Sequence, residues 1–131
     1  MITVKRIYEP AEPDDGYRIL VDRLWPRGIS KERARLDLWL KEVAPSTELR
    51  RWFHQDTSAE AQTFDEFRTR YEHELDSNPA VAELRELANA HPRITLLVAA
   101  RNPDLDHGTV LKQYLASRPA VESSKSARNT P

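Results

Sequence analysis

The chain has 131 residues and a mass of 15.1 kDa, the size of one domain with a single core. Its longest apolar run, Leu96 to Ala100, is far too short to cross a bilayer, so no membrane-spanning segment is predicted. The formal charge of −1 disfavours non-specific coating of nucleic acid, and the absence of cysteine excludes disulfides, thiolate metal sites and thiol nucleophiles.

Charge is unevenly distributed along the chain. Arg18 to Arg35 carries six basic and two acidic residues, whereas Asp56 to Glu86 carries three basic and nine acidic residues. Such runs are typical of solvated helix faces, but the basic stretch is also a candidate contact surface. The residues from Met1 to Ile7 alternate in polarity and lack the apolar run of a signal peptide, so a cytoplasmic protein is expected.

The first part of the chain predicts two strands. Ile2 to Ile7 alternates polar and apolar residues, and Tyr17 to Val21 is apolar and β-branched. Between them, Glu9 to Gly16 is acidic and contains prolines, which predicts a loop without helix. A polar loop, Asp22 to Gly28, follows the second strand because Pro26 lacks a backbone donor.

The middle of the chain predicts mainly helices. Ser30 is a candidate N-cap for a short helix that ends near Leu36, and Asp37 to Val43 fits a short strand or extended segment, although its apolar spacing also fits a helix. Three helices follow. They are predicted to begin at Pro45 or Ser46, at Ser58 or Thr63, and at Asn78-Pro79, and their apolar stripes include Trp52, Phe53, Phe64, Phe67, Tyr71, Leu75, Val81 and Leu84.

The most apolar segment, Ile94 to Ala100, predicts a central strand that is covered on both faces. The polar loop Arg101 to Gly108 and a helix from Thr109 to Ala116 follow it. The pattern predicts a small α/β domain over residues 1–117, with a layered, partly parallel sheet and helices packed on it. Residues 118–131 are small and polar, and predict a disordered C-terminal tail.

Two loops are candidates for a functional site because ligands of α/β sheets bind beyond the carboxyl ends of the strands. If their strands are parallel neighbours, these loops bring together Asp22, Arg23, Arg27, Arg101, Asn102 and His107. Guanidinium groups donate paired hydrogen bonds to carboxylate or phosphate, which predicts a small-anion site. Asp22 and His107 are candidates for acid–base catalysis, since histidine titrates near neutral pH.

Purely structural interpretations remain open for the same residues. Asp22 and Arg23 fit a local ion pair, Trp25 fits a lid over the core as well as a ligand contact, and His107 fits a helix cap. Trp39 and Trp52 are typical of a core rather than of base stacking. The remaining histidines lack metal-ligand spacing and the three glycines are not clustered, so no metal and no nucleotide cofactor is predicted.

The run from Gly16 to Gly28, GYRILVDRLWPRG, resembles the signature of the YeaO-like family, a branch of a larger family described only as a domain of unknown function. Further matches continue to about Ala116. The resemblance implies a compact α/β fold and no established activity, and its matching positions add Lys41 and Ser46 to the ligand-binding candidates. In the last loop the wider family has Cys-His-Arg, whereas this chain has Leu105-Asp-His107, so the resemblance implies no thiol chemistry here.

Two functions follow from these observations. The first is binding of a small phosphate- or carboxylate-bearing ligand between the two loops, with possible catalysis by Asp22 and His107. The alternative is a non-enzymatic interaction module that binds protein or nucleic acid through Arg18 to Arg35, with Trp25 available for stacking. The acidic helical half makes nucleic acid the weaker choice of partner, and no protein partner is indicated.

Overall fold

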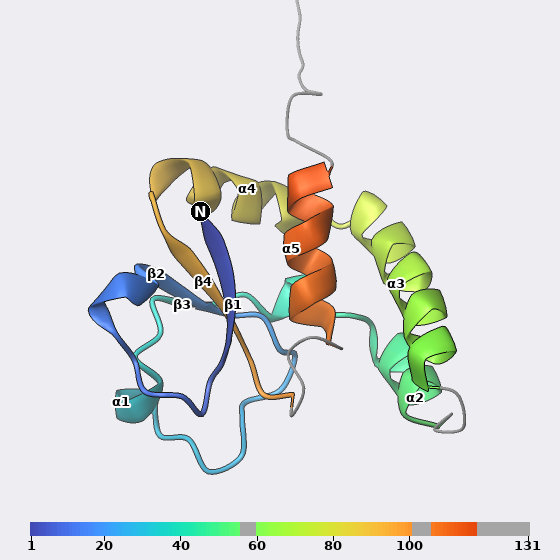
Figure 1. Ribbon diagram of the computed structural model, residues 1–131, viewed down its shortest axis with the longest axis horizontal. Coiled ribbons are helices and arrows are strands. Elements are labelled where there is room, and N and C mark those ends of the chain that lie inside the picture. Colours follow the sequence, from blue (N-terminus) through green and yellow to red (C-terminus); the bar gives the residue numbers. More distant parts are fainter. Residues whose placement is uncertain (56–59, 101–105, 118–131) are drawn as a thin grey trace, which may run out of the picture.

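Four parallel strands form one sheet in the computed structural model, which describes residues 1–55, 60–100 and 106–117 (Figure 1). The strands are β1 (Ile2–Arg6), β2 (Tyr17–Leu20), β3 (Leu38–Trp39) and β4 (Ile94–Val98). Their order is β1-β4-β2-β3, so β4 lies between β1 and β2. Every residue of β4 is buried, as its nearly continuous apolar sequence predicts. The predicted α/β class and the interior position of the Ile94 strand are confirmed.

Alternation along the strands divides the core between the two faces of the sheet. Ile19, Val21, Leu96 and Val98 face the larger cluster, which includes buried residues of the four longer helices. Leu20 and Leu97 face a smaller cluster that Ile7, Ile29 and Ala34 complete. The smaller cluster is therefore closed by the segments around β2 rather than by long helices.

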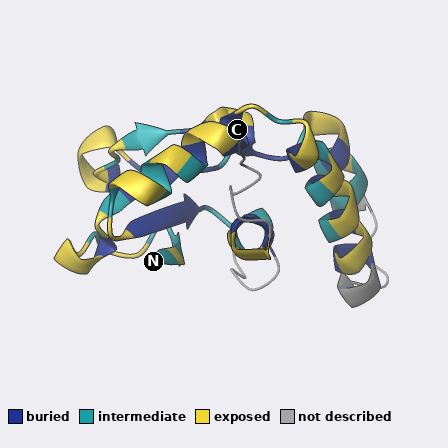
Figure 2. Ribbon diagram, turned by 90° about the horizontal axis from the view of Figure 1, so that it is seen from above, coloured by how far each residue is buried: buried dark blue, intermediate teal, exposed yellow. Residues whose placement is uncertain are grey.

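The helices are α1 (Lys31–Ala34), α2 (Thr47–Gln55), α3 (Glu60–Asp76), α4 (Ala80–Ala90) and α5 (His107–Ser117), with single 3-10 turns η1 (Pro13–Asp15) and η2 (Lys41–Val43). Helix α5 packs against β1 and β4 and lies between the sheet and α3 (Figure 1). Figure 2 shows the same arrangement from above, with buried positions gathered on the inward sides of the helices. The chain thus places the amino end of α5 beside the carboxyl ends of the strands.

Side-chain caps explain several helix starts. The Ser30 hydroxyl accepts a hydrogen bond from the Arg33 amide at 3.1 Å, and the Ser46 hydroxyl accepts one from the Leu49 amide at 3.1 Å. The Asn78 side-chain oxygen accepts from the Ala80 amide at 2.9 Å. These are the caps that the sequence predicts at Ser30, Ser46 and Asn78.

Several predicted elements differ from the structure in their bounds or type. The acidic loop contains a 3-10 turn, because Glu12 and Asp15 form a reciprocal capping box around Pro13. Helix α1 ends at Ala34, where Arg35 adopts a left-handed conformation. Helix α3 begins at Glu60, so Thr63 lies within it and is not its N-cap. Helix α5 begins two residues before Thr109. The other N-cap candidate of α3, Ser58, lies outside the described residues.

Arg18 is buried and does not contribute to a basic surface. Its guanidinium contacts the Asp15 carboxylate and donates to the carbonyl oxygens of Ala34 at 2.8 Å and Arg35 at 3.1 Å. Lys5 approaches the other oxygen of Asp15 at 3.0 Å. The buried cluster Lys5–Asp15–Arg18 therefore ties β1, η1 and β2 together and removes one cation from the predicted basic face.

The predicted tail, residues 118–131, lies outside the described residues. Within the described ranges, no helix has both the length and the apolar composition needed to span a bilayer.

Candidate functional site

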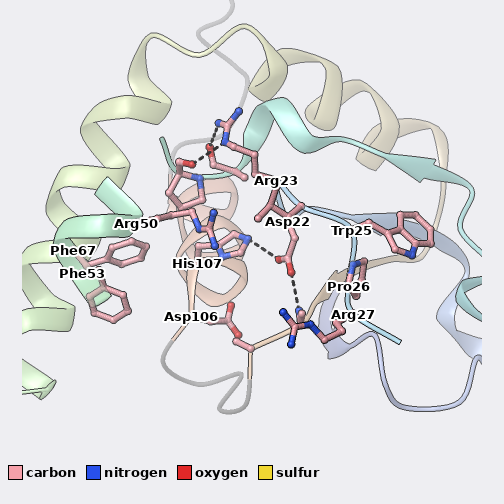
Figure 3. A pocket seen from close by; sticks show the side chains of 15 residues that line it. Asp22, Arg23, Trp25, Pro26, Arg27, Arg50, Phe53, Phe67, Asp106 and His107 are labelled. Carbon is pink, nitrogen blue, oxygen red and sulfur yellow. Dashed lines mark hydrogen bonds and ion pairs between the residues drawn. The ribbon is translucent and has the colours of Figure 1, made fainter. Parts of the chain in front are cut away.

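A cavity of about 440 Å³ opens at the carboxyl edge of the sheet (Figure 3). Its walls come from the loop after β2, the segment after η2, the residues after β4, residues of α2 and α3, and the amino end of α5. The lining residues are Asp22, Arg23, Leu24, Trp25, Pro26, Arg27, Ala44, Pro45, Arg50, Phe53, Phe67, Ala99, Ala100, Asp106 and His107. Its volume lies within the range of small-molecule sites.

His107 and Asp22 are in contact at the floor of this cavity. The His107 Nε2 atom lies 2.9 Å from the carbonyl oxygen of Val21 and 3.2 Å from Asp22 Oδ1 (Figure 3). Since a carbonyl oxygen only accepts, the hydrogen bond to Val21 requires a proton on Nε2. The other carboxylate oxygen of Asp22 accepts from the Ala99 amide at 2.9 Å. The structure thus brings together the two residues proposed for acid–base chemistry and fixes both to backbone groups.

Tyr71 supports His107 from the side of α3. Their rings meet edge-on with centroids 6.1 Å apart, and the Tyr71 hydroxyl donates to the Val43 carbonyl at 2.6 Å. Burial, followed by the nearby carboxylates of Glu74 and Asp106, raises the pKa of Tyr71 well above its ordinary value. The hydroxyl therefore remains a neutral donor to Val43 and fixes the Tyr71 ring, which packs against the His107 ring.

Several ligand-binding candidates have structural partners instead. Arg23 lines the cavity, but its guanidinium donates to the carbonyl oxygens of Ala44 at 3.1 Å and Pro45 at 3.3 Å. The Trp25 indole donates to the Ile29 carbonyl at 2.7 Å and meets Trp39 edge-on. Both residues shape the cavity wall through contacts that the fold itself requires.

The other candidates lie elsewhere or are not described. Lys41 lies 5.2 Å above the Trp39 ring and is not a lining residue. Ser46 caps α2, and its hydroxyl and amide both donate to Glu74, at 2.6 and 3.0 Å. Arg101 and Asn102 lie outside the described residues.

Two guanidinium groups at the cavity have no hydrogen bond or ion pair from their side chains among the described contacts. Arg27 is exposed in the loop after β2, and Arg50 is half-buried on α2. In Figure 3 they approach the His107–Asp22 pair from different sides. Arg50 was missed at the level of sequence because its distance from the sheet edge depends on how α2 packs, which periodicity does not encode.

Asp106 is the second residue that the sequence analysis missed. It is 5% exposed, its Oδ1 accepts from the amides of Gly108 and Thr109, and it therefore caps α5. Its Oδ2 is buried and has no hydrogen-bond partner within residues 1–55, 60–100 and 106–117. Burial raises the pKa of Asp106 to about 6, and the Asp22 carboxylate adds to that increase, while His107 and the two amides oppose it. An aspartate immediately before the first turn was the available signal, but the helix start was predicted two residues too late.

Replacing Asp106 with asparagine is expected to remove a pH dependence of stability. The raised pKa means that the folded state holds the proton more tightly than the unfolded state, so wild-type stability falls as the pH rises from about 4 to about 6. Asparagine keeps the capping oxygen and does not titrate. The variant should gain about 2 to 3 kcal/mol relative to wild type between pH 4 and pH 7, measured by urea unfolding at each pH. If the difference in stability between the variant and wild type is the same at every pH in this range, the raised pKa of Asp106 is wrong.

Across the described ranges, no three histidine, aspartate or glutamate side chains form a group that could hold a metal ion. The described lining of the cavity offers two guanidinium groups without described side-chain partners, a histidine–aspartate pair, one buried carboxyl and an apolar wall that includes Phe53 and Phe67.

Comparisons with known proteins identify the family. A family profile described as the inactive DUF488-N3 subclade matches residues 1–131. The uncharacterised protein YeaO of Escherichia coli strain K12 is 47% identical over 117 residues, which cover 88% of this chain and 97% of that protein. An uncharacterised protein of Mycobacterium tuberculosis strain H37Rv is 45% identical over 117 residues, covering 89% and 95%. No solved structure matches the chain. The chain therefore belongs to the inactive DUF488-N3 subclade, and the YeaO-like resemblance of its Gly16 to Gly28 signature is confirmed.

Proposed function

We propose that this protein binds a small phosphate- or carboxylate-bearing ligand in the cavity at the carboxyl edge of the sheet, and that it does so without converting the ligand. One observation carries the proposal. Arg27 and Arg50 line the same cavity from different elements, and neither guanidinium has a carboxylate partner among the described residues. Two such groups offer paired donors to the oxygens of one anion.

The electrostatics of the cavity support an anionic ligand. Arg23, Arg27 and Arg50 contribute three positive charges to the lining, against the two carboxylates of Asp22 and Asp106. The apolar part of the wall includes Phe53 and Phe67, whose ring centroids are 4.5 Å apart, together with Pro26 and Ala99. A ligand with an acidic group and an apolar body fits this division of the wall.

Binding without turnover fits both the geometry and the family. The His107 Nε2 proton is directed to the Val21 carbonyl, and Asp22 Oδ2 accepts from the Ala99 amide. One polar atom of each side chain is therefore engaged with the backbone. The sequence contains no cysteine that could serve as a nucleophile. The description of the matching family as inactive points the same way.

Neutralising either free guanidinium is expected to weaken binding. Purified wild type would be titrated with inorganic phosphate, phenyl phosphate, benzoate, sugar phosphates and nucleoside monophosphates in a thermal-shift assay, followed by calorimetry of those that bind. A ligand at a hundred times its Kd adds about 2.7 kcal/mol, which raises Tm by several degrees. Arg27→Gln and Arg50→Gln should each raise Kd by about tenfold to a hundredfold, because each removes a charge-assisted hydrogen bond.

Lys31→Gln is the matched control. It removes the same unit of charge from an exposed position of α1 that does not line the cavity. The control should bind as wild type does. If no anion shifts the wild-type Tm, or if both arginine variants bind as tightly as wild type, the proposed function is wrong.

The alternative, an interaction module built on Arg18 to Arg35, has less support. Arg18 is buried against Asp15, and Arg23 faces the carbonyls of Ala44 and Pro45, so two of the six cations are withdrawn from that surface. Arg27→Gln, Arg50→Gln and Lys31→Gln also distinguish ligand binding in the cavity from the interaction module. Lys31→Gln should weaken the contact of Arg18 to Arg35 with a polyanion but not the binding of a small anion in the cavity. A cytoplasmic location remains part of the proposal.

A further inference from the structure

Among the described residues, a buried carboxylate oxygen at the cavity has no donor. Asp106 Oδ1 is occupied by the amides of the first turn of α5, but Oδ2 has no hydrogen-bond partner although the residue is only 5% exposed. A buried acceptor without a donor is rare in folded proteins and costs free energy. Capping requires only one of the two oxygens, so the cap does not account for the second.

A second unpaired acceptor lies at the same cavity. Asp22 Oδ1 is buried and has no hydrogen-bond partner in the described part of the chain, because the His107 proton near it is directed to the Val21 carbonyl. Asp22 and Asp106 both line the cavity, so two of its acceptor oxygens have no donor among the described residues. The same cavity is lined by two cations without a described side-chain partner, Arg27 and Arg50. An anion alone would satisfy the cations and leave both acceptors without donors.

We infer that the ligand is a ring-containing acid that also carries an N–H donor, with its acidic group at Arg27 and Arg50 and its amino or amide group at Asp106 Oδ2. The inference rests on the proposed function and names its ligand class. The ring follows from the apolar wall, where Phe53 and Phe67 stand beside the polar floor (Figure 3). The donor follows from the two buried acceptors, since a neutral N–H satisfies either oxygen without adding charge.

Matched ligands that differ only in the donor test the inference. The probes are phenyl phosphate against its 3-amino and 4-amino derivatives, and benzoate against 3-amino- and 4-aminobenzoate, all at pH 7.5. At that pH an aromatic amine is neutral, and Asp106 is ionised because its pKa is about 6. One amino isomer of each acid should bind at least about tenfold more tightly than its parent, as expected for a hydrogen bond to a charged acceptor.

Two variants locate the effect. Asp106→Asn keeps the capping oxygen and replaces the unpaired oxygen with an amide nitrogen, and Asp106→Ser keeps a capping hydroxyl and removes the second oxygen altogether. Both remove a negative charge from the cavity, so they should bind the parent acids at least as tightly as wild type, and both should reduce the preference for the amino isomer to less than threefold. If the asparagine variant does not fold, the serine variant alone tests the role of Asp106 Oδ2. The comparison of the amino derivatives with their parent acids on wild type needs neither variant.

The outcomes separate the inference from the proposed function. If wild type binds the parent acids but no amino isomer more tightly, or if the preference survives both Asp106 variants, the donor-bearing class is wrong while anion binding stands. If neither the parent acids nor their amino derivatives bind, the inference fails, and the proposed function fails with it only if none of the other anions binds either.

Discussion

Replacing Gly16 with alanine is expected to lower the free energy of unfolding by about 4 kcal/mol or more. Gly16 has φ 66° and ψ −132°, a conformation that side chains rarely adopt, and an added Cβ would lie 2.4 Å from the carbonyl oxygen of Arg93. That same oxygen accepts from the Tyr17 amide at 2.9 Å. The backbone at Gly16 therefore cannot move away from Arg93 without breaking this hydrogen bond, which aligns β2 with β4.

Gly28→Ala provides the comparison for Gly16→Ala. Gly28 also has a positive φ, of 80°, but no atom lies within 4 Å of the position of an added Cβ. Its substitution should lower the free energy of unfolding only by the cost of placing alanine in the left-handed conformation, about 1 to 2 kcal/mol. Urea unfolding of both variants measures the difference. Equal losses at the two positions would show that the close approach of Arg93 has no energetic consequence.

Replacing Asp15 with alanine is expected to cost about 3 to 5 kcal/mol, because it leaves the buried Arg18 guanidinium without its carboxylate partner. Asp15 and Arg18 are 7% and 4% exposed, and Lys5 is held 3.0 Å from the same carboxylate. Equilibrium unfolding at pH 7 measures the loss. The neighbouring Asp14→Ala variant is the control, since Asp14 pairs with Arg93 at 3.0 Å with its side chain 92% exposed, and it should change stability by less than about 1 kcal/mol.

The Asp15 effect should depend on pH with a sign opposite to that of Asp106. Burial alone would raise the pKa of Asp15, but the Glu12 amide, Lys5 and Arg18 outweigh it and lower the pKa below the ordinary value of 3.8. A lowered pKa means that the stabilisation is complete above about pH 4 and is lost as the pH falls through the folded-state value. The difference between wild type and Asp15→Ala should therefore shrink in acid. A difference that grew in acid would contradict this interpretation.

Much of the fold could be predicted from the sequence because local patterns determine it. The continuous apolar run from Ile94 identified the interior strand, and the caps at Ser30, Ser46 and Asn78 lie where hydroxyl or amide side chains precede helical stripes. The errors arose where a few polar contacts override composition. The capping box of Glu12 and Asp15 makes a helical turn in a segment whose prolines and acids suggest a loop.

The candidate site was only partly accessible to sequence reasoning. The convergence of Asp22 with His107 follows from strand order, because parallel neighbours bring their loops to one edge. The position of Arg50 follows instead from the packing of α2, and the burial of Asp106 from the close approach of α5 to β4, where Gly108 lies against Val98. The burial of Arg18 depends likewise on Asp15, which belongs to a turn that was not predicted.

The His107–Asp22 pair also provides hydrogen-bond partners for backbone groups just beyond the carboxyl ends of β2 and β4. A parallel ladder leaves unpaired amides and carbonyls beyond its last residues, and here the Asp22 carboxylate accepts from the Ala99 amide while His107 donates to the Val21 carbonyl. The two side chains thus act for β2 and β4 as a cap acts for a helix. Variants at either position disturb the architecture together with the cavity, so lost binding there would not separate the two roles, whereas Arg27 and Arg50 can be changed without loosening the strand ends.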